Sequence, residues 1–469
     1  MSEAEIAYMP ATEMAAAIRA KRVSPVEIVA TLLARIERLE PSINAFVHLD
    51  PGGAIAAAER AEQAVMRGDP LGPLHGVPIT IKDLFWTRDM PTQYGSETMR
   101  GFRPSIDTPS VTRARNAGAV SLGKTTVSEF GWTGVSRSPL TGITHNPWRH
   151  GLNAGASSAG AGAAAAAGFG PLHQGSDGAG SIRMPSHFCG VFGLKPTYGR
   201  VPYHPVGAGD YTSHLGPMTR TVADAALLLD VMSGPSPLDH TTLDVPAGSF
   251  GEELEAGVRG RRVAFSPDLG FARVDPAVAD SVARAARVFA DDLGAEVETV
   301  TPPWASDGPE LARLFWPAHL SRHVVRLREW ETRMDPGLVA CARDGARTTM
   351  IEYQLARERK YAYVAAIHAW FEDYDLLLTP AASVAAFDAA LLMPADWPQH
   401  AWDWLSWAEF LYPFNMCGNP AASVPCGFTP DGLPVGLQIV GRRFDDAGVL
   451  AASAAFERAR PWANAKPSL

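Results

Sequence analysis

"GLNAGASSAGAGAAAAAGFGPLHQGSDGAGSIRMP", residues 151–185, contains a run from Ala154 to Gly168 made only of alanine, glycine and serine. Such a run is typical either of a flexible linker or of backbone that passes close to a neighbouring element, because its side chains are so small. Alanine is the strongest helix former, so its alanine-rich half is expected to form a helix. The two interpretations lead to different functions.

Serine hydroxyls flank this helix on both sides. Ser157 and Ser158 precede it, and Ser181 lies in a second glycine-rich turn, "DGAGSIR". Backbone N–H groups in such a turn can converge on one point and stabilise developing negative charge. The hydroxyls therefore have two interpretations from the residues alone: a nucleophile beside an anion cradle, or simple helix caps.

A nucleophilic serine needs a base, and Lys82 is the candidate. It ends "GVPITIKD" (76–83), whose alternating apolar residues predict a buried strand. Burial lowers the pKa of a lysine, so that its neutral amine can accept a proton. The alternative, equally open from the residues, is an ion pair between Lys82 and Asp83.

Composition excludes several classes of protein. The chain has 469 residues, 46% of them hydrophobic and 19% charged, which is ordinary for a large globular core. A net charge of −9 argues against a nucleic-acid surface. Apolar runs stay below the roughly 20 residues that span a bilayer. The four cysteines are scattered and the first residues lack a signal-peptide pattern, so we expect a cytoplasmic protein with reduced thiols and no membrane contact.

Strand and helix patterns alternate along the chain. A helix is expected after Ser24, with Pro25 in its first turn, and a helix-then-strand unit over 108–130. Strands are expected at "RRVAFS", "YDLLLTP", "AASVPCGF" and "GLPVGLQIVG", and a helix from Asp275 to Gly294. This rhythm predicts an α/β fold with a large mixed, mostly parallel central sheet, helices on both faces and a helical N-terminal segment.

We expect one domain over 1–469, because both halves follow the same pattern of strands and helices. Within it the interpretation is a helical N-terminal segment (1–65), a catalytic core (66–232), a variable specificity region (239–373), and returning core strands with an aromatic lid (374–460). A GxSxG elbow and a P-loop are missing, which disfavours an α/β-hydrolase and a P-loop enzyme. His319 and His323 are four apart but lack the Glu of HExxH, so no metal site is predicted.

The chain resembles the amidase signature family. The resemblance is carried by the stretches already quoted and by "THNPW" (144–148), "FCGVFGLKPTYGRVP" (188–202), "GPMTRTVADAALLL" (216–229), "FNMCGNPAASVPCGF" (414–428) and "DGLPVGLQIVGRRF" (431–444). These occur in the family's order over nearly the whole chain, and the similarity is weakest between about Asp239 and Asp373. The linker interpretation is therefore rejected.

The resemblance implies a triad of Ser181, Ser157 and Lys82. Ser181 would attack the substrate carbonyl, and Ser157, preceded by a non-proline cis peptide bond, would relay the proton to Lys82. An acyl-enzyme would form and water would release the acid. Neither a metal nor an organic cofactor is implied.

The resemblance also implies an oxyanion hole from the backbone N–H groups of Gly178, Ala179, Gly180 and Ser181. Supporting roles fall on Ser158, Asp177 and Arg183. The family's GGSSGG and DxGGS motifs here have Ala156, Ala159 and Ala179 in place of glycines. The hydroxyl and amine groups themselves are unchanged, so catalysis is still expected.

Aromatic residues suggest the substrate class. Trp404, Trp407 and Leu411 recur at helical spacing, as in a core helix or in a lid over an apolar pocket. The resemblance implies that Trp132 lies where family members commonly line the acyl channel. We expect a bulky hydrophobic or aryl amide. A carbamate (urethanase activity) or an aryl ester is the alternative with the same triad. The weaker alternatives are a non-catalytic binding protein and an amidotransferase subunit. The sequence leaves open whether the chain forms a homodimer.

Overall fold

The computed structural model describes residues 1–207, 209, 212–244 and 249–469. Within these ranges the main feature is an 11-stranded sheet. Its strands, in spatial order, are β1 (Phe46–Leu49), β3 (Val120–Thr125), β2 (Pro78–Lys82), β8 (Leu172–Asp177), β10 (His214–Thr219), β9 (Phe192–Lys195), β14 (Ala421–Phe428), β15 (Pro434–Gly441), β13 (Leu376–Pro380), β11 (Arg262–Phe265) and β12 (Glu296–Thr299). Two short ladders pair β4 (Arg137–Ser138) with β5 (Gly142–Ile143), and β6 (His145–Asn146) with β7 (Arg149–Asn153).

The sheet is mixed, as expected. Parallel pairing joins β3, β2 and β8 toward one end, where β1 is added antiparallel at the edge, and joins β13, β11 and β12 at the other end. The strands between these two blocks, β10, β9, β14 and β15, pair antiparallel with their neighbours. The expected parallel pairing therefore holds for the two blocks, whereas the centre of the sheet is antiparallel.

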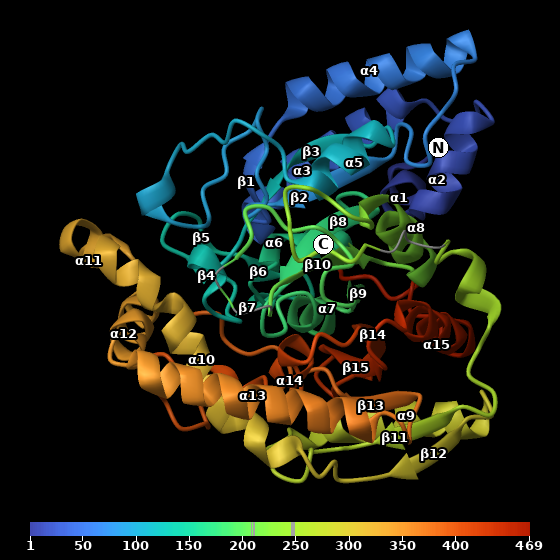
Figure 1. Cartoon of the computed structure of the whole chain (residues 1–469). Coiled ribbons are helices and arrows are strands. Elements are labelled where there is room, and N and C mark those ends of the chain that lie inside the picture. The colour runs from blue at the N-terminus through green and yellow to red at the C-terminus, as the bar shows by residue number, and fades with distance from the viewer. Residues whose placement is uncertain (208, 210–211, 245–248) are drawn as a thin grey trace.

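Helices flank the sheet along its whole width (Figure 1). They are α1 (Glu3–Tyr8), α2 (Ala11–Arg19), α3 (Pro25–Ile43), α4 (Pro51–Arg67), α5 (Pro109–Asn116), α6 (Ala159–Ala167), α7 (Arg183–Cys189), α8 (Val222–Met232), α9 (Pro276–Asp291), α10 (Gly308–Leu320), α11 (Val324–Trp330), α12 (Pro336–Gly345), α13 (Met350–Trp370), α14 (Tyr412–Met416) and α15 (Asp446–Ala459). Short 3₁₀ turns cover Glu97–Met99, Glu129–Gly131, Glu252–Glu255, Ala305–Asp307, Ser321–His323, Glu331–Arg333 and Leu405–Trp407.

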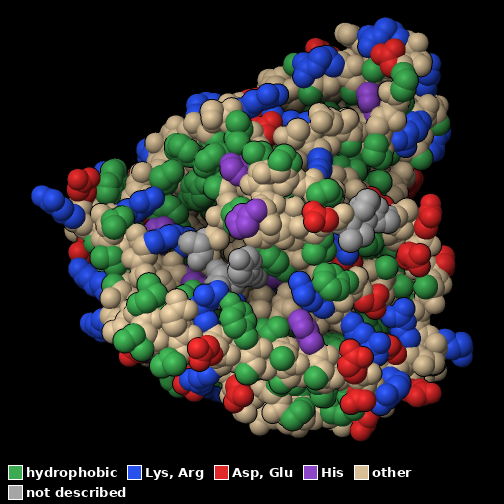
Figure 2. Space-filling view, in the orientation of Figure 1, with side chains coloured by type: hydrophobic (Ala, Val, Ile, Leu, Met, Phe, Trp, Pro, Cys, Tyr) green, Lys and Arg blue, Asp and Glu red, His purple; other side chains and the backbone are tan. Residues whose placement is uncertain are grey.

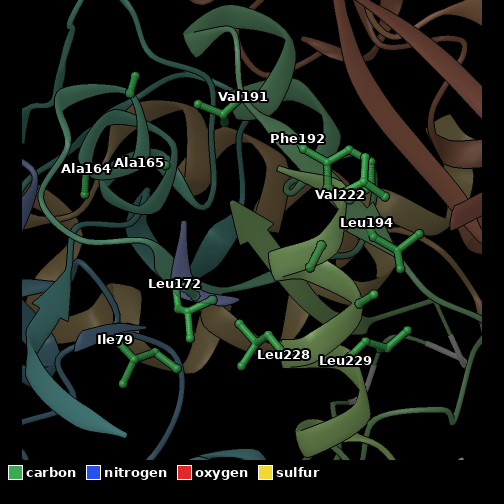
Figure 3. Close-up of a cluster of buried hydrophobic side chains, with 14 of the residues drawn as sticks. Ile79, Ala164, Ala165, Leu172, Val191, Phe192, Leu194, Val222, Leu228 and Leu229 are labelled. Atoms are coloured by element: carbon green, nitrogen blue, oxygen red, sulfur yellow. The ribbon is translucent and has the colours of Figure 1, made fainter. Parts of the chain in front are cut away.

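The two faces of the sheet are covered by different helices. On one face α6 and α7 contact each other and strands β8, β9 and β14. On the other face α8 contacts α5 and α15, and α9 packs on β13 to β15. Figure 3 shows Leu172 of β8 pointing toward Leu228 of α8, and both belong to the larger buried cluster. A second buried cluster, rich in tryptophan, lies under α10, α12 and α13.

The elements predicted from periodicity are largely confirmed. Ser24 caps α3, accepting hydrogen bonds from Val26 N and Glu27 N, and β2 ends at Lys82. The alanine-rich run forms α6, and every one of its residues is buried. The helical spacing of Trp404, Trp407 and Leu411 was misleading. This segment forms a 3₁₀ turn over Leu405–Trp407 and a separate short helix, α14.

No helix in the described ranges combines the length and the apolar character needed to cross a membrane. On the face seen in Figure 2, acidic and basic side chains are interspersed rather than gathered by sign.

Candidate active site

Lys82 ends a strand that lies inside the sheet, between β3 and β8, and its side chain is fully buried. Its Nζ contacts three hydroxyls: Ser157 Oγ at 2.8 Å, Ser158 Oγ at 2.8 Å and Ser176 Oγ at 2.9 Å. The alternative ion pair with Asp83 does not form, because the Asp83 carboxylate faces Lys124 Nζ at 3.3 Å. The amine of Lys82 is therefore surrounded by hydroxyls.

This environment determines the charge of Lys82. Burial holds the pKa of its amine well below the ordinary value, and the nearby carboxylate of Asp177 offsets only part of that effect. A lowered pKa favours the neutral form of the amine. Its nitrogen then carries a lone pair that can accept a proton from a serine hydroxyl.

The small residues around Ser157 let two elements approach closely. The peptide bond between Ala156 and Ser157 is cis, as the family resemblance implied. Gly155 has φ +76°, and a Cβ there would lie 2.5 Å from the Cα of Pro185 in α7. A Cβ at Gly160 would lie 2.5 Å from the backbone nitrogen of Thr126. The run of alanine and glycine is therefore close-packed backbone.

Ser181 lies in the turn between β8 and α7, and the carboxylate of Asp177 shapes this turn. One oxygen of Asp177 accepts a hydrogen bond from Gly180 N at 2.6 Å, and the other accepts one from Ile182 N at 3.2 Å. Gly180 has φ +114°, a region that favours glycine. The turn is thus fixed by its own first residue.

The expected oxyanion hole needs one correction. The N–H of Gly180 is committed to Asp177, so it is not available to a substrate. In the part of the chain that the structure describes, the N–H groups of Gly178, Ala179 and Ser181 have no hydrogen-bond acceptor. These three remain the candidate donors.

A buried ion pair anchors the same turn to distant strands. Arg183 Nη2 lies 2.9 Å from Asp177 Oδ1, and both side chains are fully buried. Burial alone would raise the pKa of Asp177, but the Arg183 guanidinium, together with Lys195 and Asn415, holds that pKa below its ordinary range. Arg183 also donates to Gln438 Oε1 at 2.7 Å and to Asn415 Oδ1 at 2.6 Å. Asp177 and Arg183 thus position the turn.

Ser158 contacts both Lys82 and the turn that carries Ser181. Its Oγ contacts Lys82 and donates to the carbonyl oxygen of Ser176 at 3.2 Å. Its backbone N–H donates to the carbonyl oxygen of Ser181 at 3.2 Å. It therefore connects the amine, the strand β8 and the turn.

A cavity of about 110 Å³ opens beside these groups. Ser157, Ser181 and Gly178 line it together, so the structure brings the candidate relay, nucleophile and oxyanion donor to one space. Lys82 lies behind Ser157 and does not line the cavity. The remaining described wall is formed by Leu84, Phe130, Gly131, Ser176, Tyr203, Gly207, Gly209, Thr212, Ser213, Trp316, His319, Leu320 and Arg322.

The tryptophans proposed for the substrate pocket lie elsewhere. Trp132, Trp404 and Trp407 are at most 1% exposed, and none of them lines the cavity. Trp404 Nε1 and Trp316 Nε1 each donate to the carbonyl oxygen of Trp132 at 3.0 Å. Trp407 Nε1 donates to the carbonyl oxygen of Leu392 at 3.2 Å. They belong to the second buried cluster, and the tryptophan that faces the cavity is Trp316.

Sequence reasoning missed most of the cavity wall. Trp316, His319 and Arg322 lie in the segment where the family resemblance is weakest, which was expected to carry specificity. Phe130 is two residues from Trp132, in a backbone conformation of φ 51°, and its ring packs on His323 with centroids 4.3 Å apart. A wall residue in a poorly matching segment leaves no motif by which it could be found.

Comparisons with known proteins show which family the chain and its fold resemble. A family model described as Amidase matches residues 27–450. An acylamidase from Rhodococcus erythropolis is 40% identical over 478 residues, covering 100% of this chain and 99% of that protein. A glutamyl-tRNA(Gln) amidotransferase subunit from Chloroflexus aggregans is 34% identical over 490 residues, covering 99% of each. The crystal structure of a bacterial aryl acylamidase of the amidase signature family superposes with a TM-score of 0.90, at 30% identity and 97% coverage of each chain.

Proposed function

This chain belongs to the amidase signature family, whose members act on amide bonds, and we propose that it hydrolyses small amides with Ser181 as the nucleophile and Ser157 and Lys82 as the proton relay. One observation carries this proposal. The buried amine of Lys82 lies 2.8 Å from the hydroxyl of Ser157, which shares a cavity with Ser181.

The first step forms a tetrahedral adduct on Ser181. Ser181 Oγ attacks the carbonyl carbon while its proton passes to Ser157 Oγ, and the proton of Ser157 passes to the lone pair of Lys82 Nζ. The carbonyl oxygen becomes an oxyanion that the N–H groups of Gly178, Ala179 and Ser181 can hold. Each such donor contributes roughly 10²–10³ in rate.

The following steps return the protons. The C–N bond breaks, and the leaving amine takes a proton from Ser157, which regains one from the Lys82 ammonium. Water then attacks the ester carbon, losing its proton along the same path, and the Ser181 ester bond breaks to release the acid. Lys82 ends neutral and Ser181 ends protonated, so one cycle consumes one amide and one water.

An apolar or aryl amide is the substrate class that the cavity supports best. Leu84, Phe130, Trp316 and Leu320 give it apolar walls. The relatives include an acylamidase and a bacterial aryl acylamidase. The amidotransferase relative favours glutamine as a second candidate. Carbamates and aryl esters share the same carbonyl chemistry.

A fluorophosphonate probe tests the nucleophile. We expect stoichiometric labelling of the wild type and none of Ser181→Ala. Ser213→Ala is the matched control, because Ser213 lines the same cavity and has no role in the relay. The labelling rate should fall about tenfold per pH unit below the pKa of Lys82, since the protonated amine cannot accept a proton from Ser157.

Two results would contradict the mechanism: labelling that persists in Ser181→Ala, or a labelling rate that does not change with pH down to acidic values. A panel of an anilide, an aliphatic amide, a carbamate, an aryl ester and glutamine then ranks the substrate classes. We expect the highest kcat/KM with the anilide. Glutamine as the best substrate would favour the amidotransferase role instead.

A further inference from the structure

One wall of the cavity carries an arginine without an acidic partner. Arg322 lies in the turn between α10 and α11 and lines the same cavity as Ser181. Its Nη1 donates to the carbonyl oxygen of His319 at 2.8 Å. Arg322 is exposed, and among the described residues no carboxylate forms an ion pair with it and its remaining N–H donors have no acceptor within the protein. A guanidinium has five such donors, so most of its binding capacity is unused.

A second donor lies on the same side. Tyr203 also lines the cavity, and its phenol is within electrostatic range of the Arg322 guanidinium. Its hydroxyl makes no hydrogen bond within the part of the chain described. The same wall includes the apolar side chains of Leu84, Phe130 and Leu320 beside polar ones such as Thr212 and Ser213. The cavity therefore offers the nucleophile at one place and uncommitted donors at another.

We propose that the substrate carries a carboxylate, close in the molecule to the scissile amide, which binds to the guanidinium of Arg322 with support from the hydroxyl of Tyr203. This inference rests on the proposed function, since it specifies the substrate of that same site. A planar guanidinium fits a carboxylate through two parallel hydrogen bonds. The small volume of the cavity keeps the carboxylate within a few bonds of the carbonyl.

The contrast with Arg183 supports this assignment. Arg183 follows Ser181 by two residues, but Asp177 neutralises it and three other side-chain and backbone acceptors saturate it. Arg322 lacks every equivalent contact except the one to His319. A single guanidinium balances the single charge of a carboxylate, whereas a phosphate dianion would leave charge uncompensated.

Two matched substrate pairs test the proposal. The first is glutaryl para-nitroanilide against an acyl para-nitroanilide in which an isopropyl group replaces the carboxylate. The second is N-acetyl para-aminobenzoate against N-acetyl para-isopropylaniline. The pairs place the carboxylate on the acyl side or on the leaving amine. In at least one pair we expect the wild type to prefer the carboxylate, with a preference that falls as salt is added.

Arg322→Gln then identifies the residue responsible. It should lower kcat/KM on the preferred carboxylate substrate by about tenfold or more, the scale of a charged hydrogen bond, and leave the isopropyl partner within about twofold. Arg328→Gln is the matched control, because Arg328 is an exposed arginine on α11 that does not line the cavity. It should change neither value.

The outcomes separate this inference from the proposed function. If the isopropyl substrates are cleaved and the carboxylates are not preferred, or if Arg322→Gln slows both members of a pair equally, the carboxylate site is overturned while the amidase mechanism stands. If no substrate is cleaved and Ser181 takes no fluorophosphonate label, both proposals fail together.

Discussion

At the scale of single residues, two adjacent serines contact the same amine but face different surroundings. Ser157 Oγ and Ser158 Oγ both lie 2.8 Å from Lys82 Nζ. Only Ser157 lines the cavity, whereas Ser158 is turned toward the carbonyl oxygen of Ser176. Equal distances to the base therefore correspond to unequal access to a substrate.

This difference yields a prediction. Ser157→Ala should lower kcat roughly 10²–10⁴-fold, because it removes the hydroxyl that transfers the proton. Ser158→Ala removes a hydrogen bond of the same length to the same amine and should cost about tenfold or less. Steady-state rates on an anilide check both variants, with circular dichroism to confirm folding. Equal losses in the two variants would contradict the assigned relay.

The proposed triad came from the family resemblance, whose short motifs specify particular side chains. The hydrogen-bond acceptor of each backbone N–H could not be predicted from the sequence. Gly180 was expected to serve the oxyanion, yet its N–H is taken by Asp177. Which way a carboxylate turns depends on Arg183, Asn415 and Gln438, and the last two come from segments more than two hundred positions away. Motif reasoning therefore finds the side chains of the site better than its backbone donors.

At the scale of elements, α6 is held by contact of backbone with backbone. Its residues are fully buried, and the Cα of Gly160 faces the carbonyl oxygen of Ala45 and the amide of Thr126. Neither neighbour is a flexible side-chain end, so neither can move aside easily. The position of Ser157, just before this helix, depends on that fit.

Gly160→Ala tests the fit. The added methyl group meets backbone on two sides, so we expect a loss of about 1–3 kcal/mol in the free energy of unfolding, together with lower activity. Gly52→Ala is the control in another helix, α4, where a Cβ meets nothing within 4 Å. It should be neutral or stabilising by up to about 1 kcal/mol. Thermal unfolding measures both, and an equally stable Gly160→Ala would rule out the close-packed interface.

Elements with a clear local signal were predictable: α3 from its period and its Ser24 cap, β2 from alternation, and α6 from its alanine content. The conformation of the aromatic segment around Trp404 was not predictable. Its spacing matches a helix, but the indole N–H of Trp404 bonds the carbonyl oxygen of Trp132 and that of Trp407 bonds Leu392. Packing on all sides removes the contrast between a buried and an exposed face on which periodicity depends.

At the scale of the whole molecule, one buried carboxyl group joins the part of the chain that carries the triad to the weakly matching region. Glu129 Oε2 accepts a hydrogen bond from Asp335 N at 2.7 Å, and Ser96 Oγ donates to Glu129 Oε1 at 2.6 Å. Burial raises the pKa of Glu129 to about 7. The folded protein therefore binds a proton here more tightly than the unfolded chain, in which the pKa is about 4.3.

The sign of the pH effect follows from that difference. The stability that this proton contributes is fully present below the unfolded pKa and is lost as the pH rises through about 7. Glu129→Gln cannot ionise, so relative to the wild type its free energy of unfolding should increase by roughly 2 kcal/mol between about pH 5 and pH 8. Denaturant unfolding at both pH values measures this change. Glu358→Gln, at an exposed position, is the control, and a pH-independent difference for Glu129→Gln would refute the effect.

The pairing of distant strands and the composition of the cavity were the features least predictable from the sequence. The α/β class follows from alternating patterns, but β9 pairs with β14 and β13 with β15 across long stretches of chain. The cavity likewise joins Phe130, Tyr203 and Arg322, which no motif links. These long-range contacts depend on the packing of the assembled core. No local pattern in the sequence predicts them.

The order of strands also bears on how the protein is made by the ribosome. β14 and β15 insert between β9 and β13, although they are translated well after both. Until residue 441 emerges, the edges of β9 and β13 that β14 and β15 later cover have no partners. Unpaired strand edges promote aggregation. Asn415 and Gln438, which hold Arg183, emerge in the same late interval. Synthesis from the N-terminus therefore delays completion of the turn that carries Ser181. A translation product truncated before these strands would need protection by chaperones. It would also lack an ordered reaction centre.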